Sequence, residues 1–290
     1  MKQLLAALVL TGISASWASS LELENVPGLK QSLAAIKSQA LALKPEAEPA
    51  PQKPREGSHR LGHSTPMLPF EAEEVPDISA YAVRGVDVSH HEGHIRWNQM
   101  KAAGISFAFI KATEGGGYVD DMFQANWQGA SSVGIAKSAY HFYNFCKTGT
   151  EQADNFIKTV PREDGALPMV IDLEPSNDCA HMPAKPALLK DLTNFIGKVQ
   201  AAYGLTPILY INPSIYNEYL LGTGADNKFW IADPSHAAPR MPDGKNWTFW
   251  QYAWHGTVAG LSSEVDLDVF NGGAQALSRL TQPQILAWDP

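Results

Sequence analysis

Basic clusters, glycine-rich phosphate loops and internal repeats are all missing from this sequence. It carries 22 Lys and Arg against 30 Asp and Glu, a net charge of −8, and no Lys/Arg cluster that could form a basic face, so a nucleic-acid binder is not expected. No glycine-rich motif follows any run that reads as a strand, which argues against a dinucleotide-binding domain. The 290 residues instead suit a globular domain of roughly 200 residues plus an additional segment.

A hydrophobic run long enough to span a bilayer is also missing. The apolar residues 4–13 are too few for a permanent transmembrane helix, but with Lys2 before them and the small-x-small sequence Ser16-Trp17-Ala18 after them they predict a signal peptide over residues 1–18. An uncleaved N-terminal helix is the alternative. No cysteine lies near the cleavage site, so a bacterial lipid anchor is not expected. The sequence therefore predicts an exported protein, periplasmic or extracellular, with no stable membrane insertion after cleavage.

Residues 19–80 have the composition of a connecting segment. The spacing of Leu, Ile and Ala in "LKQSLAAIKSQALAL" predicts a short amphipathic helix, and residues 45–80 are rich in Pro and Glu and poor in apolar side chains. We interpret 19–80 as a flexible spacer; a role in holding a partner is the alternative. The folded domain is expected to occupy residues 81–290.

Within this domain, apolar runs alternate with amphipathic stretches. Five strand-like runs are each followed by a helical pattern, and three short strand-like runs then follow with no long helix between them. The strand-like runs are residues 82–89, 105–113, 135–145, 167–174, 206–212, 229–234, 247–254 and 264–272. Eight strands fit a TIM-like α/β barrel better than an open sheet.

Carboxylates recur where these strands end. Asp87 ends the first strand, Asp172 and Glu174 end the fourth, and Asp266 lies in the last. Alternate residues of a strand share a face, so Asp172 and Glu174 are expected to be close neighbours at the barrel mouth. Crowded carboxylates raise one another's pKa, which gives the acid and the charged carboxylate that glycosidic cleavage needs. A Mg²⁺ or Ca²⁺ site and a purely structural role are the alternatives.

Several motifs together carry a resemblance to a known family. They are "GVDVSHHEGHIRW", "ISFAFIKATEGGGYVDDMFQAN", "GIAKSAYHFY", "PMVIDLE", "PILYIN", "FWIADP", "FWQYA" and "VDLDVFNG". Each alone is weak, but in this order across nearly all of residues 84–272 they resemble the glycoside hydrolase family 25 lysozymes, the Ch-type muramidases.

The resemblance implies a (β/α)₅β₃ barrel that hydrolyses the β-1,4 bond between N-acetylmuramic acid and N-acetylglucosamine of peptidoglycan without a cofactor or metal. It implies that Glu174 is the general acid/base and that Asp172 orients the substrate's own 2-acetamido group, which attacks the anomeric carbon. Asp87 and Asp266 would complete an acidic floor. The expected partner is the peptidoglycan glycan strand, and the expected state is a monomer.

The same motifs imply a set of substrate-binding residues. For the aromatic members, core packing is the alternative to sugar binding. The set is Tyr140, Tyr210, Lys111, Trp230, Trp250 and Gln251.

Three further features of the sequence need an interpretation beside the family motifs. Glu92 stands where Gln is common in the family and adds an acid near the cleft rim. The histidines of "SHHEGH" (His90, His91 and His94) are interpreted as solvated loop residues or subsite contacts rather than metal ligands. The only two cysteines, Cys146 and Cys179, are expected to form a disulfide between the loops after the third and fourth strands, because an exported protein meets oxidising conditions; two free thiols are the alternative.

Two other functions stay open on the sequence. A wall-binding module that has lost catalysis would keep the barrel, although the intact "DLE" argues against it. A hydrolase of chitin or another amino sugar would use the same acetamido chemistry.

Overall fold

The computed structural model describes residues 76–282 except 177, 178, 180 and 240. The predicted signal peptide, the short N-terminal helix and nearly all of the Pro/Glu-rich segment lie outside the described residues. No helix in the described part of the chain is long and apolar enough to cross a membrane.

Eight strands close into a barrel, as the sequence predicts. β1 pairs with β2 on one side and with β9 on the other, which completes the ring β1-β2-β4-β5-β6-β7-β8-β9. The strands are β1 (Val83–Val88), β2 (Ile105–Glu114), β4 (Ala136–Phe142), β5 (Val170–Asp172), β6 (Ile208–Ile211), β7 (Phe229–Ala232), β8 (Phe249–Gly256) and β9 (Val265–Phe270).

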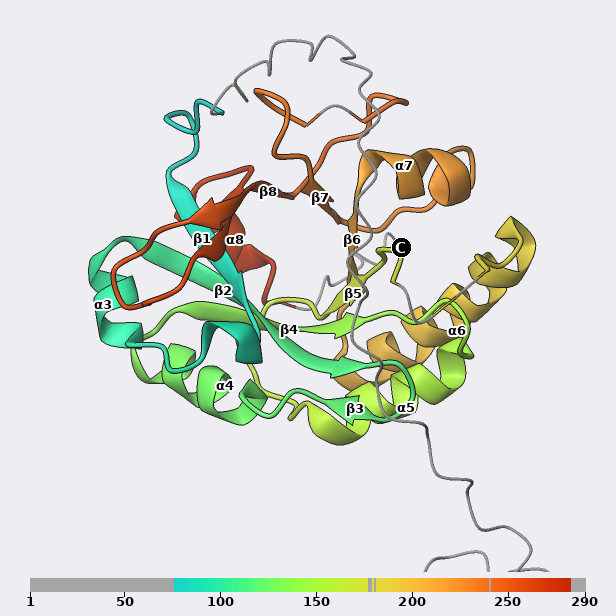
Figure 1. Ribbon diagram of the computed structural model, residues 1–290. Coiled ribbons are helices and arrows are strands. Elements are labelled where there is room, and N and C mark those ends of the chain that lie inside the picture. Colours follow the sequence, from blue (N-terminus) through green and yellow to red (C-terminus); the bar gives the residue numbers. More distant parts are fainter. Residues whose placement is uncertain (1–75, 177–178, 180, 240, 283–290) are drawn as a thin grey trace, which may run out of the picture. The chain divides into compact units, whose positions relative to one another are not determined.

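The helices cover only part of this ring. Each of the strands β1, β2, β4, β5 and β6 is followed by helical structure, whereas β7 to β9 are joined by loops (Figure 1). The helices are α3 (Trp97–Ala102), α4 (Phe123–Ser132), α5 (Gly149–Thr159), α6 (Lys185–Tyr203), α7 (Pro213–Ile215), which runs into the π-helix η2 (Tyr216–Leu220), and α8 (Ala274–Arg279) after the last strand. The (β/α)₅β₃ prediction is therefore confirmed.

Local sequence explains where the long helices begin and end. The Thr148 side chain accepts a hydrogen bond from the backbone N–H of Glu151 at 3.2 Å and so caps α5. α6 has a proline in its first turn, and it ends at Gly204, whose φ of 81° lies in the left-handed region that glycine adopts without strain.

Alternate residues of the strands build two apolar layers. One layer fills the barrel and includes Phe107, Phe109, Trp230 and Phe249; the ring centroids of Phe109 and Trp230 lie 4.2 Å apart. The other layer lies between the strands and the helices. Gly85 of β1 is needed for this packing, because a Cβ there would lie 2.3 Å from the Phe107 ring. The barrel is thus a packed core whose space for a ligand lies at its mouth.

Three features of the fold were not predicted: the direction of β9 and two short elements. β9 runs antiparallel to both β8 and β1, a direction that hydrophobic periodicity does not encode. The two-residue strand β3 (Tyr118–Val119) forms a hairpin with the end of β2, and the 3₁₀ helix η1 (His90–Glu92) follows β1. All three are set by closure of the ring or by short turns rather than by a long periodic pattern.

Candidate active site

A pocket of about 210 Å³ opens at the barrel mouth, where the parallel strands end. It is lined by Asp87, Ser89, His91, Lys111, Tyr140, Phe142, Asp172, Glu174, Tyr210, Trp230, Gln251 and Asp266. Nine of the ten residues that the sequence predicts for catalysis and substrate binding are in this set; Trp250 is the exception. The strand register explains the convergence, since Asp172 lies beside Tyr210, Tyr210 beside Trp230, and Asp87 opposite Asp266.

Asp172 and Glu174 lie side by side in the acidic wall, Asp172 buried and Glu174 half-buried. Asp172 is the last residue of β5 and is 5% exposed, and its Oδ1 has no hydrogen-bond partner among the described residues. Burial raises the pKa of Asp172 well above its usual range, and the charge of Glu174 raises it further. Burial also raises the pKa of Glu174, while the ammonium of Lys111 opposes both shifts. One of the pair therefore tends to hold a proton while the other is ionised.

Gln251 joins the other two predicted acids. Its Nε2 donates to Asp87 Oδ2 at 2.8 Å and to Asp266 Oδ2 at 3.2 Å, and its Oε1 accepts from the Tyr210 hydroxyl at 2.8 Å. Burial raises the pKa of Asp266 to about 7, helped by the charges of Glu92 and Glu174. The amide thus holds two carboxyl groups in one orientation on the floor of the pocket.

Sequence reasoning missed a fifth acid, Asp268. It is fully buried beneath the pocket, and its Oδ1 accepts a hydrogen bond from Trp230 Nε1 at 2.8 Å. Burial raises the pKa of Asp268 well above its usual range, and burial together with the charge of Asp268 does the same for the pKa of Asp87. Ionisation of one of these two carboxyl groups therefore disfavours ionisation of the other. The signal was in "VDLD", where Asp266 and Asp268 alternate on one face.

The aromatic residues of the pocket are part of its packing as well as its lining. Burial raises the pKa of Tyr140 and of Tyr210 well above the usual range, and neighbouring carboxylates add to the effect, so both phenols keep their protons. The Trp230 ring packs on Tyr210, with centroids 4.3 Å apart. Both the packing role and the pocket-lining role proposed from the sequence therefore apply to these rings.

Lys111 forms its ion pair with Glu114 rather than with Asp172 or Glu174. Its Nζ lies 2.8 Å from Glu114 Oε2 and 4.8 Å from the centre of the Phe142 ring. The ammonium still lines the pocket and favours the ionised forms of Asp172 and Glu174. Lys111 is thus a fixed positive charge at the acidic wall rather than the ion-pair partner of either acid.

Trp250 does not reach the pocket, which corrects the prediction that it stacks on a sugar. It is fully buried, and its Nε1 donates to the backbone oxygen of Asp233 at 2.9 Å. Its ring packs near Tyr81 and Trp247. Because Gln251 points into the mouth, its neighbour Trp250 must point to the opposite face of the strand. Trp250 is therefore a packing residue.

Comparison with known proteins agrees with this geometry. The model of the glycosyl hydrolases family 25 matches residues 86–261. The chain belongs to this family. Lysozyme M1 of Streptomyces globisporus is 36% identical over 265 residues, which cover 84% of this chain and 90% of that protein. Among solved structures, a family 25 glycosyl hydrolase from Bacillus anthracis has a TM-score of 0.69 at 32% identity and covers 73% of this chain and 100% of its own. The lysozyme of Streptomyces coelicolor has a TM-score of 0.64 at 38% identity and covers 69% and 97%.

The predicted disulfide is confirmed in this family 25 barrel. Cys146 and Cys179 are bonded, with their Cα atoms 5.4 Å apart. Cys146 lies in the loop after β4, and Cys179 lies five residues after Glu174 in the loop after β5. The bond thus ties together the two loops beside the general acid that the family resemblance implies.

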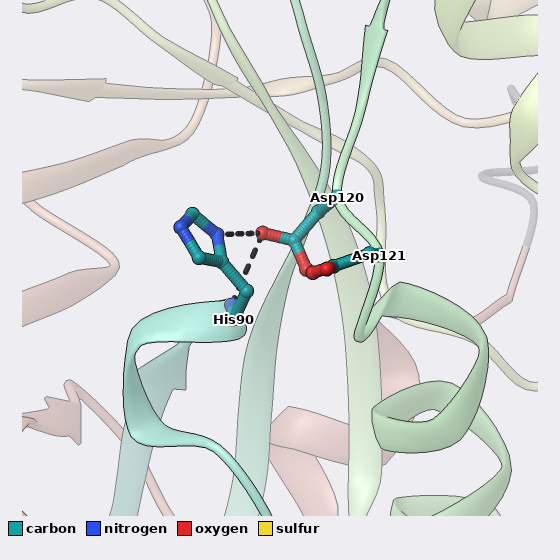
Figure 2. Close-up of side chains that lie close together, drawn as sticks. All are labelled: His90, Asp120 and Asp121. Atoms are coloured by element: carbon teal, nitrogen blue, oxygen red, sulfur yellow. Dashed lines mark hydrogen bonds and ion pairs between the residues drawn. The ribbon is translucent and has the colours of Figure 1, made fainter.

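The wall formed by η1 contains the predicted histidine cluster. Asp120 Oδ2 accepts hydrogen bonds from the backbone N–H of His90 at 3.1 Å and pairs with His90 Nδ1 at 2.7 Å, and Asp121 lies alongside (Figure 2). Asp120 Oδ1 also accepts from the backbone of Met122. These hydrogen bonds give the cluster a structural role, because they connect η1 to the chain that follows β3. His91 lines the pocket, in line with a subsite contact, and His94 is exposed.

Glu92, which stands where the family resemblance implies Gln, has a structural partner. Its Oε2 accepts from the backbone N–H of Ser89 at 2.6 Å and from the Ser89 hydroxyl at 3.2 Å, while the Ser89 hydroxyl accepts from His91 N. This capping box fixes the start of η1. The carboxylate also raises the pKa of Asp266, so the departure acts on the floor of the pocket through its charge.

Proposed function

We propose that this chain is an exported lysozyme that hydrolyses the β-1,4 bond between N-acetylmuramic acid and N-acetylglucosamine of peptidoglycan. Membership of family 25 and the similarity to the lysozymes of two Streptomyces species support this function. The observation that carries it is the pair Asp172 and Glu174, in which a buried carboxylate oxygen without a described partner lies beside a carboxyl group of raised pKa.

Glu174 is the proton donor in the proposed reaction. It gives its proton to the glycosidic oxygen as the bond from that oxygen to the anomeric carbon breaks. The carbonyl oxygen of the substrate's 2-acetamido group attacks the anomeric carbon and forms an oxazolinium-like intermediate. The Glu174 carboxylate then takes a proton from the water that opens this intermediate, and the anomeric configuration is retained. Burial favours the protonated donor at the start of this cycle.

Asp172 orients the acetamido group. Its free Oδ1 would accept the acetamido N–H, and its negative charge would stabilise the positive charge of the intermediate. Asp87, Asp266 and Gln251 hold the floor against which the sugar rests. The enzyme supplies no covalent nucleophile in this scheme.

The direct test is a digest of purified peptidoglycan by wild type and by Glu174→Gln, followed by borohydride reduction and mass spectrometry. We expect wild type to release fragments with reduced muramic acid ends and the variant to release at least about 100-fold less. If both proteins sediment with the wall and neither releases fragments, the chain is a binding module. Faster turnover of chitin oligomers than of peptidoglycan would instead favour a hydrolase of chitin-like sugars.

The N-terminal segments fit the same function. We propose that residues 1–18 direct export and are removed, that residues 19–80 are a spacer, and that residues 81–290 form the catalytic unit. The Cys146–Cys179 bond is consistent with an extracytoplasmic location, periplasmic or extracellular. Deletion of residues 19–78 should leave activity and localisation unchanged; mislocalised protein would show that the segment is more than a spacer.

A further inference from the structure

Trp254 is the most exposed large apolar side chain in the described part of the barrel, at 53% exposure. It lies near the end of β8, three residues beyond Gln251, and its Nε1 donates to Gln251 Oε1 at 3.0 Å. An indole has one polar atom, and here that atom is already bonded toward the pocket. The exposed remainder of the side chain is therefore an apolar aromatic surface beside the acidic mouth.

The position of this ring is set by the floor of the pocket. Gln251 Oε1 accepts from both Trp254 and Tyr210, and Gln251 Nε2 donates to both Asp87 and Asp266. All donors and acceptors of the amide are used, which fixes its orientation. Trp254 is thus connected through one side chain to two pocket carboxyl groups, and its ring cannot rotate freely without breaking that bond.

The pocket itself is too small for a polymer. Its volume of about 210 Å³ is below the roughly 300–1,000 Å³ of pockets that enclose a drug-sized ligand, so the sugars on either side of the one it holds must lie over the rim. Two carboxylates lie near Trp254: Asp266 is on the pocket floor, and Glu264 pairs with His255 at 3.0 Å on the same hairpin. The negative charge of these carboxylates favours binding of a neutral sugar over binding of an anionic group.

We propose that Trp254 is a stacking platform for a neutral N-acetylglucosamine unit of the glycan strand, next to the sugar held in the pocket. The proposal rests on the proposed lysozyme function and assigns to Trp254 the sugar-stacking role that the sequence suggested for Trp250. The apolar C–H face of the pyranose lies on the exposed indole, while the N–H bond to Gln251 holds the ring in place.

The test compares Trp254→Ala and Trp254→Phe with wild type on glycan strands freed of their peptides. Leu221→Ala is the matched control, because Leu221 is another exposed apolar side chain and does not line the pocket. We expect Trp254→Ala to raise KM about tenfold with kcat within about twofold, and Trp254→Phe, which keeps a ring but loses the N–H, to raise KM less than about threefold. The thermal midpoint of each variant confirms that it is folded.

Each outcome bears on a separate claim. An unchanged KM in Trp254→Ala overturns the platform while the lysozyme function stands. Equal losses in the Phe and Ala variants also overturn it, because the N–H bond and not the ring face would then matter. If wild type and Leu221→Ala release no reduced muramic acid ends, the proposed function fails and the platform fails with it.

Discussion

The barrel interior and the barrel mouth are built by the same strands, but the interior buries apolar side chains and the mouth buries carboxyl groups. On β2, Phe109 lies in the apolar layer and Lys111, two residues later, lines the pocket; on β8, Phe249 and Gln251 are related in the same way. The interior buries apolar surface and stabilises the fold. The mouth buries carboxyl groups whose charged forms are disfavoured there. A shift of two residues along a strand thus separates the part that holds the fold from the part suited to chemistry.

The largest stability effect is expected in the interior. Phe109→Ala removes a ring that packs on Phe107, Trp230 and Phe249, with centroids 4.2–5.4 Å away. The cavity should lower the free energy of unfolding by about 3–5 kcal/mol, measured by denaturant unfolding. A loss below 1 kcal/mol would contradict the view that this layer is a tightly packed core.

The disulfide should have the next largest effect. It closes a loop across a sequence separation of 33 residues, and its removal in Cys146→Ser/Cys179→Ser should lower the free energy of unfolding by about 2–4 kcal/mol. Because the bond ties the loop that follows Glu174, kcat on peptidoglycan should also fall. Full activity of the folded double variant would show that the bond acts on stability alone.

His141, in the layer between the strands and the helices, should make the stability of the protein sensitive to acid. It is buried between Thr113 and Gln152, with bonds of 2.7 and 3.1 Å, and burial lowers the pKa of this imidazole from 6.5 to about 4. The unfolded chain binds the proton first, so this stabilising contribution is present above pH 6.5 and is lost as the pH falls toward 4. The loss is at most about 3 kcal/mol. Unfolding at pH 7 and pH 4.5, compared with His141→Asn, measures it; an equal pH dependence in the variant would contradict the assignment.

Asp266 at the barrel mouth should make the free energy of unfolding depend on pH in the opposite direction to His141, and by a smaller amount. The pKa of Asp266 is about 7 when folded and 3.8 unfolded, so the folded state loses stability relative to the unfolded chain as the pH rises from about 4 to 7. Asp266→Asn removes this loss and should stabilise the protein by about 0.5–2 kcal/mol at neutral pH. Denaturant unfolding of the variant across this pH range is the measurement, and a destabilised variant at pH 7 would contradict the account.

Periodicity was enough to predict much of the fold and the grouping of the four acids, whereas the other site residues and the role of each were implied by the family resemblance. The two-residue spacing of Asp172 and Glu174 groups them in the sequence, although β5 ends at Asp172 and Glu174 lies just beyond it. Parallel strands bring their ends to one edge, so acids far apart in the sequence could also be grouped. Alternation along a strand excludes Trp250 once Gln251 is assigned to the mouth, which the sequence interpretation overlooked. Trp254 could not be found this way, because the β8–β9 register shifts between Gln251 and Ala253 and again before Gly256.

The burial of Asp268 beneath the pocket also could not be predicted from the sequence. The antiparallel β9 sets Asp268 beside Gly85 and Gln251, and only the closed ring shows that this acid is buried with Asp87. Likewise, Glu92 could be recognised as an extra acid, but its bonds to Ser89 depend on the turn geometry of η1. Long-range closure and short turns, rather than residue pattern, determine these contacts.

The most direct test of the contrast between interior and mouth is one variant, Asp172→Asn, measured for both activity and stability at pH 7. The account predicts that release of reduced muramic acid ends falls by at least about 100-fold while the free energy of unfolding rises, because the amide removes a buried carboxyl whose ionised form is disfavoured. A variant that is less stable than wild type, or that keeps its activity, would contradict the claim that this carboxylate is buried for chemistry at the expense of stability.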